Sequence, residues 1–256
     1  MNKNHKIYVA GHKGMIGSFL LEELKNRGYT NTITKESDQI DLRDKSKTMD
    51  FLERAQPDYV FLIAGKVGGI QANINNPASF LYDNIMIASN VIEISRIVGV
   101  KKLLYLGSSC IYPRDCPQPM KEEHLLGGFL EPTNEGYALA KISGMKLCEY
   151  YNQQHGTNYL SLIPCNLYGE GDHFETEGSH VISALLYRMH QAKIQGDAEV
   201  VVWGTGNTRR EFLFVDDFSK AILHFVGKVD AKQMQGFVNV GSGKDQSIRD
   251  LAYMVK

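Results

Sequence analysis

The chain has 256 residues and a formal net charge of −1, a length that suits one large domain or a domain with a smaller appendage. A net charge this small does not attract nucleic acid or an anionic membrane, and the apolar runs, such as Leu103 to Leu106, are too short to cross a bilayer. None of the four cysteines forms a C-x-x-C pair, so we expect reduced thiols in a cytoplasmic protein.

The N-terminal segment predicts a strand, a glycine turn and a helix. Residues 6–10 form a short β-type run, which is followed by Gly11-His12-Lys13-Gly14-Met15-Ile16-Gly17 and by an amphipathic helix over about 16–26. Glycines three residues apart let the backbone turn tightly and approach a pyrophosphate at the helix N-terminus. Directly after an N-terminal strand, this turn predicts a dinucleotide site.

Charges near the second predicted strand indicate which dinucleotide binds. This strand covers about 32–35, and its end would lie beside the adenosine ribose. Lys13 and Lys35 are cations that favour the 2′-phosphate of NADP, whereas Glu36 and Asp38 are acidic residues of the kind that favours NAD. We expect NADP(H), with an ordinary solvated charge as the alternative role of either lysine.

Helices and strands then alternate up to residue 164. Predicted helices cover about 45–56, 77–98 and 134–156, and predicted strands cover about 59–63, 102–107 and 159–164. This alternation predicts an α/β fold with a Rossmann-type, doubly wound parallel sheet. The helix over 77–98 is apolar nearly all round, which predicts burial on two sides, by the sheet and by a second subunit of a homodimer.

The candidate chemistry lies between residues 108 and 141. Tyr137 and Lys141 are four residues apart, so they share one helix face about one turn apart. A nearby ammonium group favours the phenolate, so we expect Lys141 to lower the pKa of Tyr137. Such a phenol can protonate a carbonyl oxygen while hydride arrives at the carbon, and the Ser108 hydroxyl at the end of the fourth strand can hydrogen-bond the same oxygen.

These segments resemble the extended short-chain dehydrogenases/reductases and, within them, the GDP-L-fucose synthases. The matching segments are 11–17, 66–70, 107–113, 131–135, 137–141, 166–169, 179–182 and 210–212. The resemblance implies NADPH-dependent reduction of the 4-keto group of a GDP-4-keto-6-deoxy sugar, with epimerisation at C3 and C5. It also implies a dinucleotide-binding domain over 1–165 and a smaller substrate-binding part over 166–256 that interleaves with it.

Roles for individual residues follow from the same resemblance. The implied reductase set is Ser108, Tyr137 and Lys141, and the implied epimerisation pair is Cys110 and His180. The residues implied to bind the cofactor are Gly11, Lys13, Gly14, Met15, Ile16, Asp41, Leu42, Lys141, Asn166, Leu167 and His180. Those implied to bind the substrate are Ser108, Ser109, Asn166, Arg188, Trp203 and Arg210. The two arginines are either surface charges or guanidinium forks for the diphosphate oxygens.

Taken without the resemblance, several of these side chains have plainer interpretations. Cys110 can be a small buried hydrophobe, and His180 a helix cap or a satisfied polar residue. Trp203 ends a predicted β-run over 200–202 and can belong to the core, and Asp216-Asp217 predicts a helix N-cap. No metal is expected, because the histidine and cysteine spacing fits no zinc pattern.

The chain also departs from the family pattern. Lys13 stands where the relatives usually carry arginine, which slightly weakens the expectation of NADP. Gly65 and Gly136 stand where they usually carry alanine and proline, and these changes in the backbone near the active site indicate a different sugar. Ser247 starts a predicted helix that is still in progress at Lys256, so we expect a substrate-binding part that is incomplete at this end. Two other functions therefore stay open: a non-catalytic NADP-binding regulator, and a C4 reductase with little or no epimerase activity on a related GDP-4-keto sugar such as a heptose, in surface polysaccharide synthesis.

Overall fold

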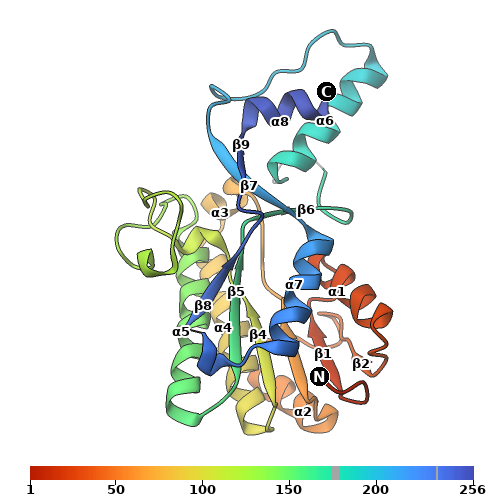
Figure 1. The fold of residues 1–256 in the computed structure, drawn as a ribbon, viewed down its shortest axis with the longest axis vertical. Coiled ribbons are helices and arrows are strands. Elements are labelled where there is room, and N and C mark those ends of the chain that lie inside the picture. Colours follow the sequence, from red (N-terminus) through yellow and green to blue (C-terminus); the bar gives the residue numbers. More distant parts are fainter. Residues whose placement is uncertain (175–178, 235) are drawn as a thin grey trace.

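The structure is a computed structural model that describes residues 1–174, 179–234 and 236–256. Over these residues, six parallel strands form one sheet and three more form a smaller sheet (Figure 1). In sheet order, the large sheet consists of β2 (Thr32–Ile33), β1 (Ile7–Ala10), β3 (Tyr59–Leu62), β4 (Lys102–Leu106), β5 (Tyr159–Pro164) and β8 (Phe237–Val240). The predicted Rossmann-type parallel sheet is confirmed.

Helices cover both faces of the large sheet. One face carries α2 (Lys45–Ala55), α4 (Pro77–Ile97) and α5 (Glu135–His155), and the other carries α1 (Met15–Asn26) and α7 (Val215–Lys228). Successive strand residues point to opposite faces, so Tyr8 and Ala10 pack into the α4–α5 core while Ile7 and Val9 pack against α1 and α7. A strand buried on both faces is apolar at nearly every position, which is why β1 reads as a continuous apolar run and β4 does so from Leu103 onward.

Helix boundaries follow from local residue chemistry. α4 begins at Pro77, where the missing N–H removes no intrahelical hydrogen bond. α5 ends at Gly156, whose left-handed backbone (φ 66°) closes the last turn without a Cβ clash. The short elements are α3 (Ile70–Asn75) and the 3₁₀ turns Ser109–Ile111, Glu122–His124 and Ala231–Gln233. Nowhere in the described part of the chain is a helix both long and apolar enough to span a membrane.

The smaller unit lies beyond the carboxyl ends of the large sheet's strands (Figure 1). It contains β6 (Asn166–Tyr168), β7 (Arg209–Phe214), β9 (Asp245–Ser247), α6 (Val181–Gln195) and α8 (Ile248–Val255). Its small core is centred on Ile182, Leu185 and Leu251. The chain after residue 165 also supplies α7 and β8, which pack on the large sheet, so this segment contributes to both units.

Two local predictions are wrong and one is confirmed. Residues 200–202 do not form a strand, because apolar β-formers also need a neighbouring strand to pair with. Val202 instead packs against α6 and α8. Trp203 is 82% exposed and does not belong to the core. Asp216-Asp217 does not cap α7, because β7 runs directly into the helix through Phe214, and the two carboxylates lie in the first turn, where the helix dipole favours them. Ser247 does cap α8, since its Oγ accepts a hydrogen bond from the Asp250 amide at 3.0 Å.

Candidate active site

Four reactive side chains converge where β4 ends and α5 begins. Ser108 follows β4 directly, Cys110 lies in the 3₁₀ turn after it, and Tyr137 and Lys141 lie one turn apart on α5. The Ser108 hydroxyl lies close enough to the Tyr137 phenol and to the Cys110 thiol to oppose the rise in the pKa of both groups. The Lys141 ammonium lies 5.6 Å from the centre of the Tyr137 ring, and its charge also acts on Cys110.

The pKa of Tyr137 does not move in the predicted direction. Burial raises the pKa of Tyr137, and the neighbouring Ser108 hydroxyl only partly opposes this. The Lys141 Nζ instead donates a hydrogen bond to the Leu106 carbonyl oxygen at 2.9 Å. The predicted lowering is therefore wrong for this structure, because the ammonium group is committed to a carbonyl and the phenol is shielded from water. A neutral phenol is the form that donates a proton.

Lys141 itself is strongly perturbed. The residue is 3% exposed, and burial lowers the pKa of Lys141 to about 8. The hydrogen-bond acceptor found for its Nζ in the described structure is a neutral carbonyl, which stabilises the charge less than a carboxylate does. Lys141 therefore carries its charge at neutral pH but loses it under mildly alkaline conditions.

The two predicted epimerisation residues lie on different elements. Burial raises the pKa of Cys110, so its thiol is protonated at neutral pH. His180 is the N-cap of α6, and a hydrogen bond with Asp172 raises the pKa of His180. The hydrogen bonds and ion pairs within the described ranges do not join His180 to the Ser108 cluster.

No pattern in the sequence predicted a role for Asp172. Its side chain is 4% exposed, and its Oδ1 lies 3.0 Å from the His180 Nδ1. The only local signal was an aspartate in a glycine-containing turn, eight residues before His180. Such an aspartate is indistinguishable from an ordinary turn residue until the fold brings the two side chains together.

The glycine turn has the shape that a dinucleotide needs. Gly11 has a left-handed backbone (φ 89°), and a Cβ there would meet the backbone after β3 at 2.7 Å. A Cβ on Gly17 would collide with the Gly11 carbonyl oxygen. Gly14 is the N-cap of α1 without a side-chain cap, so the first-turn amides at Met15 and Ile16 face no capping group. These residues fit a pyrophosphate at the helix N-terminus.

A carboxylate lies close to one of the two lysines predicted to favour NADP. The Lys13 Nζ lies 2.6 Å from Glu36 Oε1, in a pair whose side chains are 68% and 40% exposed. Both groups follow the strands that lead to the expected adenosine site. Glu36 would therefore compete with a bound 2′-phosphate for the charge of Lys13.

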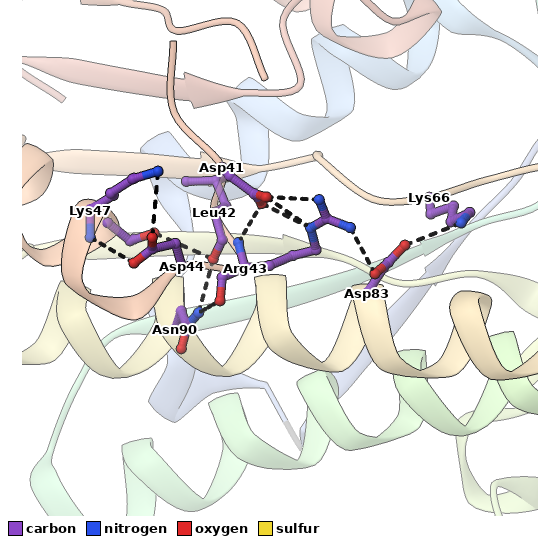
Figure 2. A network of polar contacts seen from close by, with 9 residues as sticks. Asp41, Leu42, Arg43, Asp44, Lys47, Lys66, Asp83 and Asn90 are labelled. Atoms are coloured by element: carbon purple, nitrogen blue, oxygen red, sulfur yellow. Dashed lines mark hydrogen bonds and ion pairs between the residues drawn. The ribbon is translucent and has the colours of Figure 1, made fainter. Parts of the chain in front are cut away.

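A chain of charged groups connects the loop after β2 with the loop after β3 (Figure 2). Arg43 donates hydrogen bonds to both oxygens of Asp41 and, through Nη1, to Asp83 Oδ1 at 3.0 Å. The Lys66 Nζ donates to the other oxygen of Asp83 at 3.2 Å. Burial alone would raise the pKa of Asp83, but the hydrogen bonds from Arg43 and Lys66 hold it below its ordinary value.

Two asparagines of α4 fix the same loops through their backbones. The Asn90 Nδ2 donates to the carbonyl oxygens of Leu42 and Arg43, as Figure 2 shows. Asn84 accepts from the Lys66 amide at 2.9 Å and donates to the Lys66 carbonyl oxygen at 3.0 Å. α4 therefore positions both Asp41-Leu42, predicted to bind the cofactor, and the loop at the carboxyl end of β3.

Gly136 lies where the first turn of α5 meets the first residue of α4. A Cβ there would lie 2.8 Å from the Pro77 carbonyl oxygen, so α4 and α5 approach too closely for a side chain. A hollow of about 250 Å³ opens beside Tyr137 at this point, and Asn73 and Ile74 of α3 line its other side. The departure at Gly136 therefore shapes the surface next to the phenol.

Of the predicted substrate-binding residues, the fold brings Arg188 and Trp203 side by side and leaves Arg210 and Asn166 on separate strands. The Arg188 guanidinium lies 5.6 Å from the centre of the Trp203 ring and donates to the Val201 carbonyl oxygen. Arg210 is exposed on β7, and Asn166 on β6 donates its amide to the Glu211 carbonyl oxygen. Ser109 begins the 3₁₀ turn beside Ser108, and Leu167 packs against the α1–α7 core. Their binding roles stay predictions.

Among the described residues, no group of three or more His, Cys, Asp or Glu side chains could hold a metal.

Together, this sheet, glycine turn and Ser-Tyr-Lys cluster define the class of Rossmann-fold dehydrogenases and epimerases. Residues 7–241 match the NAD dependent epimerase/dehydratase family, and the chain belongs to that family. GDP-L-fucose synthase 1 of Arabidopsis thaliana is 48% identical over 255 residues, which are 100% of this chain and 78% of that protein. GDP-L-fucose synthase of Escherichia coli (strain K12) is 47% identical, over 98% of this chain and 80% of that protein. The solved GDP-mannoheptose C4 reductase of Campylobacter jejuni, with NADP bound, is 39% identical with a TM-score of 0.93, over 100% of this chain and 84% of that one.

Proposed function

We propose that this protein uses NADPH to reduce the 4-keto group of a GDP-4-keto-6-deoxy sugar and epimerises C3 and C5 of the same ring. The observation that carries the proposal is the convergence of Ser108, Cys110, Tyr137 and Lys141 beside β4. Relatives that are nearly half identical over the whole chain bear the name GDP-L-fucose synthase. The four free thiols are consistent with work in the cytoplasm.

The proposed reduction uses the neutral phenol. NADPH, when bound, supplies the hydride, and the residues that would hold it are the glycine turn, Lys13 and the loop Asp41-Leu42. Tyr137 gives its proton to the ketone oxygen, which it can do because its raised pKa keeps the phenol protonated. Ser108, which lies beside that phenol, orients the oxygen, and the positive charge of Lys141 stabilises the phenolate that forms.

The proposed epimerisation uses the acidity that a 4-keto group gives to the protons on C3 and C5. Ser108 and Tyr137 hold the enolate oxygen, as an oxyanion hole does. His180, whose pKa is raised by Asp172, is suited to give a proton, and Cys110 to take one as thiolate. Because burial raises the pKa of Cys110, the thiolate form and the exchange rate rise with pH.

A second candidate is a C4 reductase with little or no epimerase activity, acting on a related GDP-4-keto sugar such as a heptose in surface polysaccharide synthesis. It is favoured by the structural match to the C4 reductase of Campylobacter jejuni. The test of both is incubation of the protein with several GDP-4-keto sugars and NADPH, with product stereochemistry determined by NMR. An inverted, reduced 6-deoxyhexose supports the main proposal, a reduced sugar without inversion supports the second, and no NADPH oxidation with any sugar overturns both.

We infer that the two parts of the chain divide the binding. Residues 1–165 carry the glycine turn and the loops that α4 fixes, and we assign the cofactor to them. Residues 166–256 carry the stacked pair Arg188 and Trp203, to which we assign the nucleotide end of the substrate. A guanidinium beside an exposed aromatic ring is suited to a diphosphate with a stacked base.

NADPH is expected to bind at least about tenfold more tightly than NADH, because a lysine at the 2′-phosphate adds a charge-assisted hydrogen bond. Lys13→Gln should weaken NADPH and leave NADH unchanged. Glu36→Gln should strengthen NADPH a few-fold, since it frees Lys13 from its ion pair. Fluorescence titration of both cofactors measures this. Equal affinities in the unmutated protein, or no response to either change, would rule the assignment out.

A homodimer is the expected state in solution. Partly or fully exposed apolar side chains line the outer faces of the packed helices α4 and α5, namely Leu81, Tyr82, Ile85, Met86, Leu139, Leu147 and Tyr150. Pairing these faces across a two-fold axis would bury them in a four-helix interface. Light scattering should give twice the chain mass, and Tyr82→Asp should halve it. Tyr253→Asp, at a similarly exposed tyrosine on α8, is the matched control. A monomer before mutation contradicts the proposal.

A further inference from the structure

A buried carboxylate lies behind His180. The Asp172 side chain is 4% exposed, whereas that of His180 is 60% exposed. The Nδ1 of His180 lies 3.0 Å and 3.2 Å from the two Asp172 oxygens. A carboxylate so shielded needs hydrogen-bond donors, and Asp172 also accepts from the Ser183 hydroxyl at 2.5 Å and from the His173 amide at 2.9 Å. Three donors therefore hold this carboxylate in one orientation.

This arrangement determines which nitrogen of His180 is available. A carboxylate accepts hydrogen bonds and cannot donate them, so the contacting Nδ1 must carry a proton. The Nε2 is then the atom that gains or loses a proton during exchange, as in other carboxylate-backed histidines. Asp172 is the charged group that acts on His180 within the described residues, and the neighbours of α6 in the small core are apolar.

The same turn lies close to the glycine turn at residues 11–17. A Cβ built on Gly171 would lie 3.8 Å from the Cα of Met15, the first residue of α1. Asp172 therefore follows directly after a backbone segment that lies beside the glycine turn. This proximity places the buried carboxylate at the edge of the expected dinucleotide site rather than on a distant surface.

We propose that Asp172 is a positioning residue that, with Ser183 behind it, holds His180 in the Nδ1-protonated form and leaves Nε2 to deliver the proton during epimerisation. The proposal rests on the proposed function for its reaction. Its structural half, the protonation state and tautomer of His180, does not depend on any substrate.

The structural half is tested by NMR on the protein with ¹⁵N-labelled histidine, without substrate. Asp172→Asn should lower the midpoint of His180 titration, because an amide accepts a hydrogen bond but does not stabilise the imidazolium by charge. Ser183→Ala, which keeps the carboxylate, should lower it less, and both folded variants should keep the chemical shifts of the histidines other than His180 and the neighbouring His173. An unchanged His180 titration in folded Asp172→Asn overturns the proposal.

The catalytic half is tested by deuterium uptake at C3 and C5 of a GDP-4-keto sugar in D₂O. Asp172→Asn should slow uptake about tenfold, less than the 10²–10⁴-fold that a general acid typically supplies. The same change made on top of His180→Asn should cost nothing further, because a residue that acts through His180 has no effect once His180 is gone. Additive losses overturn the proposal. If the unmutated protein takes up no deuterium, the proposed epimerisation fails, while the NMR result still decides the role of Asp172.

Discussion

Tyr137→Phe is expected to lower the rate of NADPH-dependent ketone reduction by about 10²- to 10⁴-fold, the range that a positioned general acid supplies. The phenol is a buried proton donor beside Ser108, and phenylalanine keeps the ring's packing against Phe80, whose centre lies 6.3 Å away. The loss should therefore appear in turnover and not in folding. Stopped-flow measurement of NADPH oxidation under single-turnover conditions isolates this step.

Cys110→Ala is the contrasting variant for the same experiment. It should mainly slow deuterium uptake at C3 and C5 in D₂O without NADPH, measured by mass spectrometry, and leave more of the hydride transfer intact. The separation is expected because Ser108 lies beside both groups, yet only the phenol is suited to protonate the ketone oxygen. If Tyr137→Phe reduces the ketone at the unmutated rate, the phenol is not the acid. If Cys110→Ala and His180→Asn exchange as fast as the unmutated protein, neither is the proton carrier.

Lys141→Met is expected to stabilise the protein near neutral pH while abolishing most of its activity. The folded-state pKa of Lys141 is about 8, against 10.5 for an ordinary lysine. At about 1.4 kcal/mol per pKa unit, burial of the charged lysine lowers the free energy of unfolding by about 3 kcal/mol at neutral pH. Lys141→Met removes this penalty but also removes the hydrogen bond to the Leu106 carbonyl, which stabilises the fold by about 1 kcal/mol. We therefore expect the variant to be more stable by about 2 kcal/mol at pH 7.

The pH dependence gives this prediction its sign. Between pH 8 and 10.5 the unfolded chain binds the lysine proton and the folded chain has released it, so the Lys141 contribution to stability rises with pH over that window. Thermal unfolding of both proteins should therefore show the advantage of Lys141→Met shrinking above pH 8. The buried tyrosines and cysteines titrate in both proteins, so their contribution cancels in the difference in stability between the two. An advantage that does not change with pH would contradict the prediction.

Lys102→Met is the matched control for a buried lysine. Lys102 is 8% exposed, but its Nζ pairs with Asp230 at 2.9 Å and donates to two carbonyl oxygens, those of Val226 and Val229. Removing one partner of such a pair leaves the others unsatisfied, so this variant should be destabilised at neutral pH. If Lys141→Met raises the free energy of unfolding and Lys102→Met lowers it, the effect of an ion-pair partner is separated from the effect of burial.

Local patterns were sufficient for much of this protein. The glycine turn after β1, the alternation of strands and helices, and the one-turn spacing of Tyr137 and Lys141 each depend on residues close together in the chain. Backbone periodicity and glycine geometry act at that range, so the elements could be predicted to within a few residues at their ends. The resemblance to the GDP-L-fucose synthases rested on the same short segments and is confirmed by relatives that match the whole chain.

What the sequence did not determine depends on groups that meet only in the folded protein. The pKa of Tyr137 rises instead of falling, because burial outweighs a lysine whose Nζ faces the Leu106 carbonyl. Arg43 meets Asp83 from 40 positions away, on another element. Asp172 becomes a partner of His180 only when the fold brings its carboxylate against the N-terminus of α6. Desolvation and charge pairing depend on distance in space and on exclusion of water, and neither quantity can be read from spacing along the chain.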